Sequence, residues 1–322
     1  MTLSLELDDI RAAAKVLDGV AHRTAVLSSR SLDEAVDGTV LLKCENFQRT
    51  GSFKFRGAFN KVSSLTDDER VRGVCTVSSG NHAQALALAA REFGIPAAIL
   101  MPDDAPRAKV DATRGYGADV VTYDRYSVPQ FEAGRRFAAD RHMTFVSSHD
   151  DPMISAGAGT AALELFEDAG TVDLLVAPVG GGGGIAGYAT VAKASTADAR
   201  VFGAEPAAGG VNKRSLEAGE RVSIDVPKTI ADGQQLTTPG AFPFEVMRDK
   251  VDDIVLVSDE EIVGAMAVLF ERLKIVTEPS GAIATAAVLS GKIDVRGARV
   301  GVIVSGGNIG AGRFAELVGG RA

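Results

Sequence analysis

The chain alternates short runs of β-branched and other apolar residues with longer, Ala-rich stretches of helical periodicity from Val40 onward. This alternation is typical of βαβ units, in which crossover helices join parallel strands. The apolar runs predict strands at residues 39–44, 73–77, 96–101, 119–122, 143–146, 172–178, 200–204, 253–257 and 299–305. The stretches between them predict helices that include residues 81–93, 105–115, 131–141 and 154–169. The predicted fold class is therefore α/β.

One long stretch departs from this pattern. Residues 207–235 contain few apolar positions with a regular period, and we expect them to form a surface loop. No repeat of fixed period or low-complexity linker marks a domain boundary elsewhere. The pattern alone therefore does not divide the chain into domains.

Composition excludes several classes of protein. The chain has 322 residues, 46% of them hydrophobic, and a net charge of -8 without a long basic run, so nucleic acid is not an expected partner. The N-terminus has no signal-peptide pattern and no apolar run approaches the roughly 20 residues that span a bilayer, so we expect a cytoplasmic protein with no membrane partner. Cys44 and Cys75 are too few for a disulfide scaffold, and we expect both to be reduced.

A glycine run follows one of the predicted buried strands. Residues 172–179 lead directly into this run, and a helical pattern resumes at Ile185. Bare backbone N–H groups at a helix N-terminus suit a phosphate, because the helix dipole is positive there and no side chain intervenes. The sequence therefore predicts a phosphate-binding loop made of Gly180, Gly181, Gly182, Gly183 and Gly184.

The loop alone leaves the phosphate compound open. Gly182, Gly184 and Gly187 match the spacing of the dinucleotide fingerprint, and Glu205 follows a strand at nearly the distance expected for a ribose contact. Five successive glycines equally suit a loop around one terminal phosphate. A nicotinamide-dependent oxidoreductase therefore remains an alternative at this point.

Four motifs, in order along the chain, carry a resemblance to a known family. They are Ser52-Phe53-Lys54-Phe55-Arg56-Gly57, Ser78-Ser79-Gly80-Asn81-His82, Pro178-Val179 with the glycine run, and Ser305-Gly306-Gly307-Asn308. With these motifs the chain resembles the serine/threonine dehydratases and serine racemases, which are fold-type II pyridoxal-phosphate enzymes similar to the tryptophan synthase β-subunit. The resemblance extends over nearly the whole chain.

The resemblance implies an architecture and an oligomeric state. It implies a two-domain α/β fold with twisted, parallel-type sheets flanked by helices. The expected large, cofactor-binding domain consists of residues 1–52 and 147–322, and the expected small, substrate-carboxylate-binding domain of residues 53–146. Family analogy also implies a homodimer. Because the chain ends soon after its last strand and helix, we expect no C-terminal regulatory domain.

The resemblance also implies how pyridoxal 5′-phosphate is held. Lys54 binds the cofactor covalently and removes the substrate Cα proton, while the glycine run binds the phosphate. The remaining implied cofactor contacts are Phe53, Asn81, Glu278, Ser305 and Gly306. Ser305 is expected to face the pyridine nitrogen, where a neutral hydroxyl makes the cofactor a weaker electron acceptor than a carboxylate would and favours elimination. Glu278 equally suits the start of an Ala-rich helix.

The implied substrate contacts lie mainly in the second motif. Ser78, Asn81 and His82 are expected to bind the substrate carboxylate at the start of a helix. Ser79 is an expected catalytic and substrate-binding residue, because serine racemases and hydroxyaspartate dehydratases have serine there while dedicated threonine dehydratases usually have alanine. Its hydroxyl suits two-base proton transfer, but a serine there would also serve as a helix N-cap.

Two positions depart from the racemase pattern. Gln130 falls where racemases and hydroxyaspartate dehydratases carry an arginine near the substrate, so a second substrate carboxylate would lose its charged partner. Glu205 and Gly209 match the family's divalent-metal site, but Val211 stands where a second acid is expected. A divalent cation is therefore doubtful.

Together these observations predict a lyase with a small hydroxy amino acid substrate. We expect it to remove water and ammonia from threonine or serine and to give a 2-oxo acid. A serine racemase, or an enzyme with both activities, is the first alternative. A nicotinamide-dependent oxidoreductase and a non-catalytic binding protein are alternatives from other classes.

Overall fold

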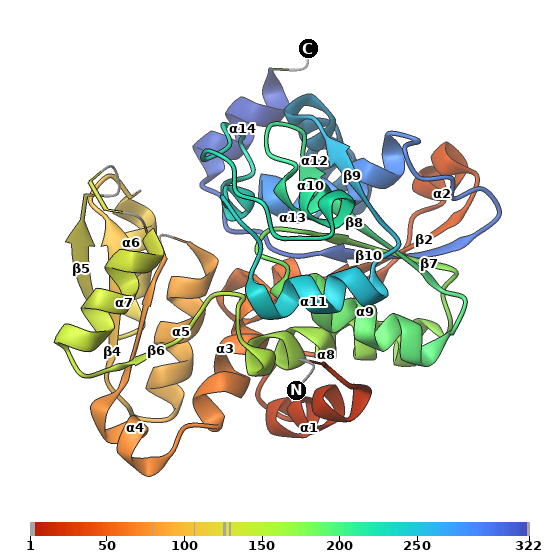
Figure 1. Cartoon of the computed structure of the whole chain (residues 1–322). Helices are drawn as coiled ribbons and strands as arrows, with labels where there is room; N and C mark the ends of the chain where they lie inside the picture. The colour runs from red at the N-terminus through yellow and green to blue at the C-terminus, as the bar shows by residue number, and fades with distance from the viewer. Residues whose placement is uncertain (1–3, 79, 106, 125–126, 129, 321–322) are drawn as a thin grey trace.

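Two sheets, each covered by helices, form the protein (Figure 1). The computed structural model describes residues 4–78, 80–105, 107–124, 127–128 and 130–320. The larger sheet has the strand order β1-β2-β10-β7-β8-β9, and the smaller sheet has the order β5-β4-β3-β6. Within these sheets neighbouring strands are parallel, except that β1 is antiparallel to β2. The predicted α/β class is confirmed, with one antiparallel edge strand that the pattern did not predict.

The elements of the six-stranded sheet come from both ends of the chain. Its strands are β1 (Val26–Leu27), β2 (Thr39–Cys44), β7 (Leu174–Pro178), β8 (Arg200–Pro206), β9 (Asp253–Val257) and β10 (Arg299–Val304). The helices on one face are α1 (Leu7–Leu17), α8 (Pro152–Ala169), α9 (Gly183–Ser195) and α11 (Ala241–Lys250) (Figure 1). Those on the other are α2 (Arg30–Val36), α12 (Asp259–Leu273), α13 (Pro279–Leu289) and α14 (Ala311–Gly319), while α10 (Val211–Ala218) packs against the edge strand β9 and against α11.

The smaller sheet is continuous in sequence. Its strands are β3 (Val74–Val77), β4 (Ala97–Pro102), β5 (Asp119–Tyr123) and β6 (Thr144–Phe145), and its helices are α4 (Asp67–Arg72), α5 (Asn81–Glu92), α6 (Arg107–Gly115) and α7 (Gln130–Asp140). This sheet falls inside residues 53–146, the expected small domain. The exact domain boundaries stay a prediction. Among the described residues, no helix has both the length and the apolar character that crossing a membrane requires.

The strand predictions succeed because each strand has a simple period. Every predicted strand, and each of the four named helices, has bounds within two residues of those predicted. Along β7, Leu174 and Val176 pack with α12 and α13, while Leu175 and Ala177 pack with α8 and α9. Because successive side chains in a strand point to opposite faces, an apolar run covered on both sides is the expected signature of a central parallel strand.

The predicted surface loop at residues 207–235 is wrong in part. It contains the helix α10 and a 3-10 turn, η3 (Asp232–Gln234), and Asn212 and Ser215 are fully buried. Gln234 donates hydrogen bonds to the backbone carbonyls of Val179 (2.8 Å) and Ala204 (3.0 Å). The segment is thus folded by contacts with distant strands, which a search for local periodicity does not detect.

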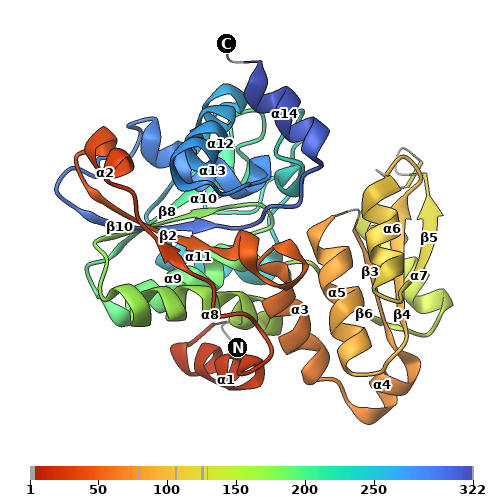
Figure 2. The ribbon, with the colours of Figure 1, turned by 180° about the vertical axis from the view of Figure 1, so that it is seen from behind.

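Helix α3 (Lys54–Ser63) lies between α8 of the larger lobe and α5 of the smaller lobe in both views (Figures 1 and 2). Two glycines let it approach α8 closely. A Cβ atom at Gly157 would lie 2.5 Å from the Arg56 carbonyl oxygen and 2.7 Å from the Gly57 Cα. A Cβ at Gly57 would lie 2.7 Å from the Ile154 carbonyl oxygen. Any larger residue at either position would push the two helices apart.

Substituting Gly157→Ala should therefore lower the free energy of unfolding by about 2 kcal/mol, because the added methyl group meets backbone that cannot move aside. Urea denaturation measures this change. Gly312→Ala in α14 is a matched control, since nothing lies within 4 Å of its Cβ position. It should leave stability unchanged or raise it by up to about 1 kcal/mol. Equal stability losses in the two variants would contradict the tight contact.

Candidate active site

A cavity of about 450 Å³ lies where the carboxyl ends of the strands of both sheets meet. Pro178 ends β7, Pro102 ends β4 and Tyr123 ends β5, and all three residues line the cavity. Ser305 and Ser78, which follow β10 and β3 directly, line it as well. Ligands of open parallel sheets bind at this end of the strands, so the position is the one that the topology favours.

Most of the predicted site residues are brought together in this cavity. Those that line it are Phe53, Lys54, Ser78, Asn81, His82, Gln130, Gly180, Gly181, Gly182, Gly183, Gly184, Glu278 and Ser305. Gly306 lies just behind it, close to Ser52 and the Glu278 carboxylate. Ser79 lies outside the described residues. The individual roles of all these residues stay predictions.

The glycine run forms the N-terminus of α9. Gly182 is the N-cap residue and has φ +93°, a left-handed conformation that favours glycine. The first N–H groups of a helix have no partner within the helix, so those of α9 are available to a ligand at the cavity wall. This geometry fits the predicted phosphate site.

His149, which was not predicted as a site residue, leaves no room for a side chain at Gly181 or Gly183. A Cβ at Gly181 would lie 2.2 Å from the His149 Cγ atom, and a Cβ at Gly183 would lie 2.6 Å from the His149 carbonyl oxygen. Burial and the nearby Lys54 amine lower the pKa of His149 to about 4, so the ring is neutral near pH 7. The loop therefore lacks side chains partly because an uncharged imidazole packs against it.

Lys54 is the first residue of α3, and its side chain reaches the cavity. The Nζ atom donates a hydrogen bond to the Ser148 carbonyl oxygen at 2.8 Å and lies 4.9 Å from the centre of the Phe53 ring. Burial lowers the pKa of Lys54 to about 8, against the opposing effect of the Glu278 carboxylate. A lysine with this pKa has about a tenth of its amine uncharged at pH 7, compared with less than about one in a thousand at the ordinary value.

Glu278 lies at the N-cap position of α13, before Pro279, but its side chain does not cap the helix. The Asn81 side-chain amide instead donates to Glu278 Oε1 at 2.6 Å, and Asn308 donates to Asn81 Oδ1 at 2.8 Å. Burial, together with the Asp232 carboxylate, raises the pKa of Glu278 to about 8. The residue is therefore mostly an uncharged acid near neutral pH, held in place by Asn81.

The predicted carboxylate site lies at the N-terminus of α5, where Gly80 is the N-cap residue. The helix dipole favours an anion there. Burial and the Lys54 amine lower the pKa of His82 to about 3, and its Nε2 atom lies 3.3 Å from the Val146 carbonyl oxygen. Since a carbonyl can only accept, Nε2 carries the proton and Nδ1 cannot donate to a carboxylate. His82 is therefore a neutral part of the wall of this site and adds no positive charge to it.

An ion pair that sequence reasoning missed closes one side of the cavity. Lys109 of α6 lies 2.5 Å from the Asp232 carboxylate of η3, and both residues line the cavity. The pair joins segments 123 residues apart. Ser148 and His149 were also missed, although a polar run directly after a strand, at residues 147–150, is a signal that could have found them.

Gln130 lies at the rim of the cavity at the start of α7. Its side-chain amide donates to the Val77 carbonyl oxygen at 3.2 Å, just ahead of the carboxylate site. The position therefore adjoins the bound substrate in the predicted arrangement. It supplies a neutral amide and no charge.

At the family's divalent-metal position, where the sequence made a cation doubtful, the Glu205 carboxylate is hydrogen-bonded by the protein itself. Both Glu205 oxygens accept the Asn212 backbone N–H at 3.1 Å, Lys213 N–H donates at 3.2 Å, and the Asn212 side chain donates at 2.9 Å. The carboxylate thus binds the first turn of α10, and Val211 offers no oxygen ligand. Among the described residues, no group of three His, Cys, Asp or Glu side chains could hold a metal ion. These residues do not fit a divalent cation.

The chain is similar to proteins of known sequence and structure. A family model described as pyridoxal-phosphate dependent enzyme matches residues 17–306. An L-threo-3-hydroxyaspartate ammonia-lyase of Pseudomonas sp is 48% identical over 99% of this chain and 99% of that protein. A serine racemase of Schizosaccharomyces pombe is 44% identical over 97% of this chain and 96% of that protein. A crystal structure of the threonine deaminase of T.th. superposes with a TM-score of 0.89, at 40% identity, over 95% of this chain and 99% of that chain.

The pKa of Lys54 predicts how its reaction with an aldehyde depends on pH. Raising the pH removes the proton from the amine, so the rate of addition should rise through about pH 8 and then level off. Pyridoxal phosphate is a suitable probe, with the product reduced by borohydride and Lys54 modification measured by mass spectrometry. Near pH 8 Glu278 is partly ionised and its carboxylate raises the Lys54 pKa, so Glu278→Gln should move the midpoint to lower pH. A rate that continues to rise beyond pH 10 would show an ordinary, solvated lysine.

Proposed function

The chain belongs to the pyridoxal-phosphate-dependent enzymes, and on that premise we propose that it is a dehydratase of L-threonine or L-serine. The proposed reaction removes the β-hydroxyl group as water and the amino group as ammonia, leaving a 2-oxo acid. The observation that carries the proposal is Lys54, a half-buried lysine whose amine reaches the cavity and whose pKa is lowered to about 8. It faces a cavity bounded by the N-termini of α5 and α9.

The residues of the cavity fit the cofactor. Its phosphate suits the N-terminus of α9, where Cβ atoms would fill the loop and N–H groups are available. Ser305 is 6% exposed and its hydroxyl offers a neutral partner for the pyridine ring. When bound, the cofactor supplies an electron-accepting ring that makes the substrate Cα–H acidic.

The chain's own groups bind the substrate and move its proton. The carboxylate of the amino acid is bound at the N-terminus of α5 by Ser78 and the backbone N–H groups that follow it. Lys54 is the base for the Cα proton, and burial keeps enough of its amine uncharged at neutral pH. Glu278 is mostly uncharged near neutral pH and accepts a hydrogen bond from Asn81. It therefore adds little negative charge beside Lys54 and the carboxylate site.

The charge distribution favours a neutral side chain on the substrate. Among the described lining residues, Lys109 is neutralised by Asp232 and Lys54 has its proposed catalytic role. Gln130 brings an amide to the rim, and Asp232 would repel a further anion. A second substrate carboxylate would thus be left without a cationic partner. This supports threonine or serine over 3-hydroxyaspartate, although the Pseudomonas relative bears the name of a hydroxyaspartate ammonia-lyase.

Three further features of the proposal rest on the sequence. Ser79 remains the predicted residue for racemisation, which would be an accompanying activity. A homodimer and a cytoplasmic location likewise stay predictions.

The purified protein should be yellow, and its visible absorbance should change on adding L-threonine or L-serine while 2-oxo acid accumulates. Lys54→Ala should lower turnover at least about 1,000-fold and lose the lysine-linked absorbance. Lys61→Ala, on the same helix but paired with Asp151 at 2.8 Å, is the matched control and should remain active. Chiral analysis of recovered serine separates a racemase, which would invert serine without forming 2-oxo acid. A protein that takes up no pyridoxal phosphate would contradict the proposal.

Gln130→Arg should shift the substrate preference toward L-threo-3-hydroxyaspartate. The added guanidinium gives a second carboxylate a charged hydrogen-bond partner, so the ratio of kcat/KM for hydroxyaspartate to that for threonine should rise about tenfold or more. Gln130→Glu is the matched variant of opposite charge and should lower the same ratio. If wild-type enzyme already prefers hydroxyaspartate over threonine, the substrate part of the proposal is wrong.

A further inference from the structure

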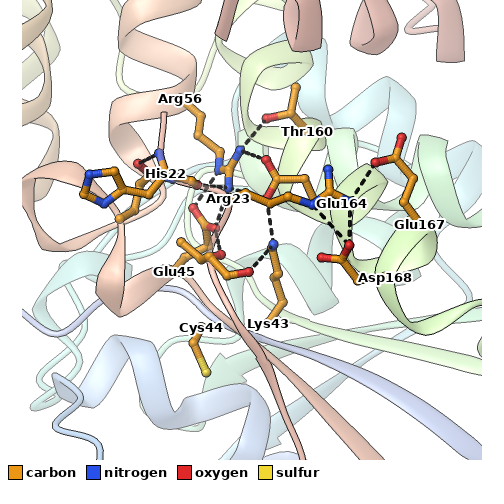
Figure 3. A network of polar contacts seen from close by, with 12 residues as sticks. His22, Arg23, Lys43, Cys44, Glu45, Arg56, Thr160, Glu164, Glu167 and Asp168 are labelled. Carbon is orange, nitrogen blue, oxygen red and sulfur yellow. Dashed lines mark hydrogen bonds and ion pairs between the residues drawn. The ribbon is translucent and has the colours of Figure 1, made fainter. Parts of the chain in front are cut away.

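Four charged side chains are buried together beside the first turn of α3 (Figure 3). We refer to Arg56, Lys43, Glu45 and Glu164 as the Arg56 cluster. The side chains of Arg56, Lys43 and Glu45 are 0% exposed, and that of Glu164 is 15% exposed. Two positive and two negative charges make the cluster neutral overall.

Arg56 lies at the centre of the cluster and binds both acids through two nitrogens each. Its Nε and Nη2 atoms donate to the two Glu45 oxygens, each at 2.8 Å. Its Nη1 and Nη2 atoms donate to the two Glu164 oxygens at 2.7 and 2.8 Å. Thr160 Oγ1 (3.2 Å) and the His22 carbonyl oxygen (3.1 Å) accept further hydrogen bonds. The planar guanidinium is thereby fixed in both position and orientation.

The contact joins the start of α3, which carries Lys54, to β2 and α8 of the larger lobe. Glu45 directly follows β2, Glu164 belongs to α8, and Arg56 is two residues after Lys54. Lys43 of β2 donates a hydrogen bond to Glu164 at 2.6 Å, which links β2 directly to α8. The first turn of α3 is therefore attached to the larger sheet and to its covering helix at the same time.

Stability alone does not account for such a cluster. Removing four charged groups from water costs several kcal/mol for each ion, and apolar residues of similar volume are often as stabilising or more so. Bidentate hydrogen bonds fix the orientation of a side chain and of the backbone that carries it, whereas apolar packing does not. Lys54 needs this, because its long side chain is flexible and its amine reaches its target only if the backbone is correctly placed.

Backbone hydrogen bonds also fix the residues that precede Lys54. Phe53 N–H donates to the Ser305 carbonyl oxygen at 3.0 Å, and Ser52 forms an isolated antiparallel bridge with Gly306. These bonds lie on the N-terminal side of the lysine. On the C-terminal side the Arg56 side chain adds its hydrogen bonds to the close contact of Gly57 with α8, so the backbone of Lys54 is held from both directions.

We propose that Arg56 is a positioning residue for Lys54, fixing the amine relative to the glycine run and Ser305. The inference rests on the proposed function only in taking Lys54 as the cofactor-binding lysine. Its action is geometric, because the Lys54 pKa is governed by burial and Glu278 and not by members of the cluster. A change in Arg56 should therefore alter how fast Lys54 captures the cofactor without altering the pH midpoint of that capture.

Arg56→Lys tests this, because it keeps the buried positive charge and removes the planar fork. Apo protein is mixed with pyridoxal phosphate, reduced with borohydride, and the modified lysines are identified by mass spectrometry across pH. The rate of Lys54 modification should fall about 10- to 100-fold with the midpoint unchanged. In the loaded enzyme kcat should fall by a similar factor, with KM for the amino acid changing less than about threefold, since the substrate carboxylate site is not part of the cluster.

Arg23→Lys is the matched control. Arg23 binds Glu167 and Asp168 of the same helix α8, but its side chain is 52% exposed (Figure 3). An exposed pair of this kind contributes little, so all readouts should stay at wild-type values. If Arg56→Lys fails to fold, the double variant Lys43→Met, Glu164→Gln removes one charge of each sign. It keeps the cluster neutral and is tested in the same way.

A folded Arg56→Lys with a lower melting temperature but wild-type capture and kcat would make the cluster purely structural and overturn the proposal. A shifted pH midpoint would overturn it too, since the cluster would then act through charge. If wild-type Lys54 is not labelled at all, the proposed function fails before any Arg56 variant is compared. If wild type is labelled but turns over no hydroxy amino acid, only the proposed function fails.

Discussion

The proposed site depends on the amine of Lys54, whose partial burial at the start of α3 lowers its pKa to about 8. The burial depends on how closely α3 packs against α8, which Gly57 and Gly157 permit by leaving no side chain between the helices. It also depends on the bonds that link the start of α3 to the end of β10. Helix α3 is thus the element through which the packing of the fold determines the chemistry of the site.

The cavity has two proposed anion sites, with uncharged side chains between them. Both proposed anion sites are helix N-termini, those of α9 and α5, which attract negative charge through N–H groups that need no titration. Between them His82, His149 and Glu278 are uncharged near neutral pH because burial shifts each pKa toward the neutral form. In the proposed reaction the Cα proton is removed by Lys54, and Glu278 titrates in the same pH range.

Within this family one scaffold is found in proteins with different names. Proteins 40 to 48% identical to this chain are named as a hydroxyaspartate ammonia-lyase, a serine racemase and a threonine deaminase. In this chain the proposed preference for a neutral substrate side chain rests on Gln130, which lies at the cavity rim. Glu205 shows a different kind of divergence, since backbone N–H groups of α10 satisfy a carboxylate that the resemblance had assigned to a metal.

The sequence by itself determined what depends on neighbouring residues. Strand positions, the glycine run before α9 and the Lys54 motif could all be found in it, because their signals are local periods and short motifs. It did not yield α10, whose first turn is bonded to Glu205 of the preceding strand, nor the Lys109–Asp232 pair, whose partners lie 123 residues apart. It likewise gave no sign that Arg56 would meet Glu164, 108 residues away. Only the tertiary structure decided these contacts, because burial, and with it the pKa of Lys54, is a property of how distant segments pack.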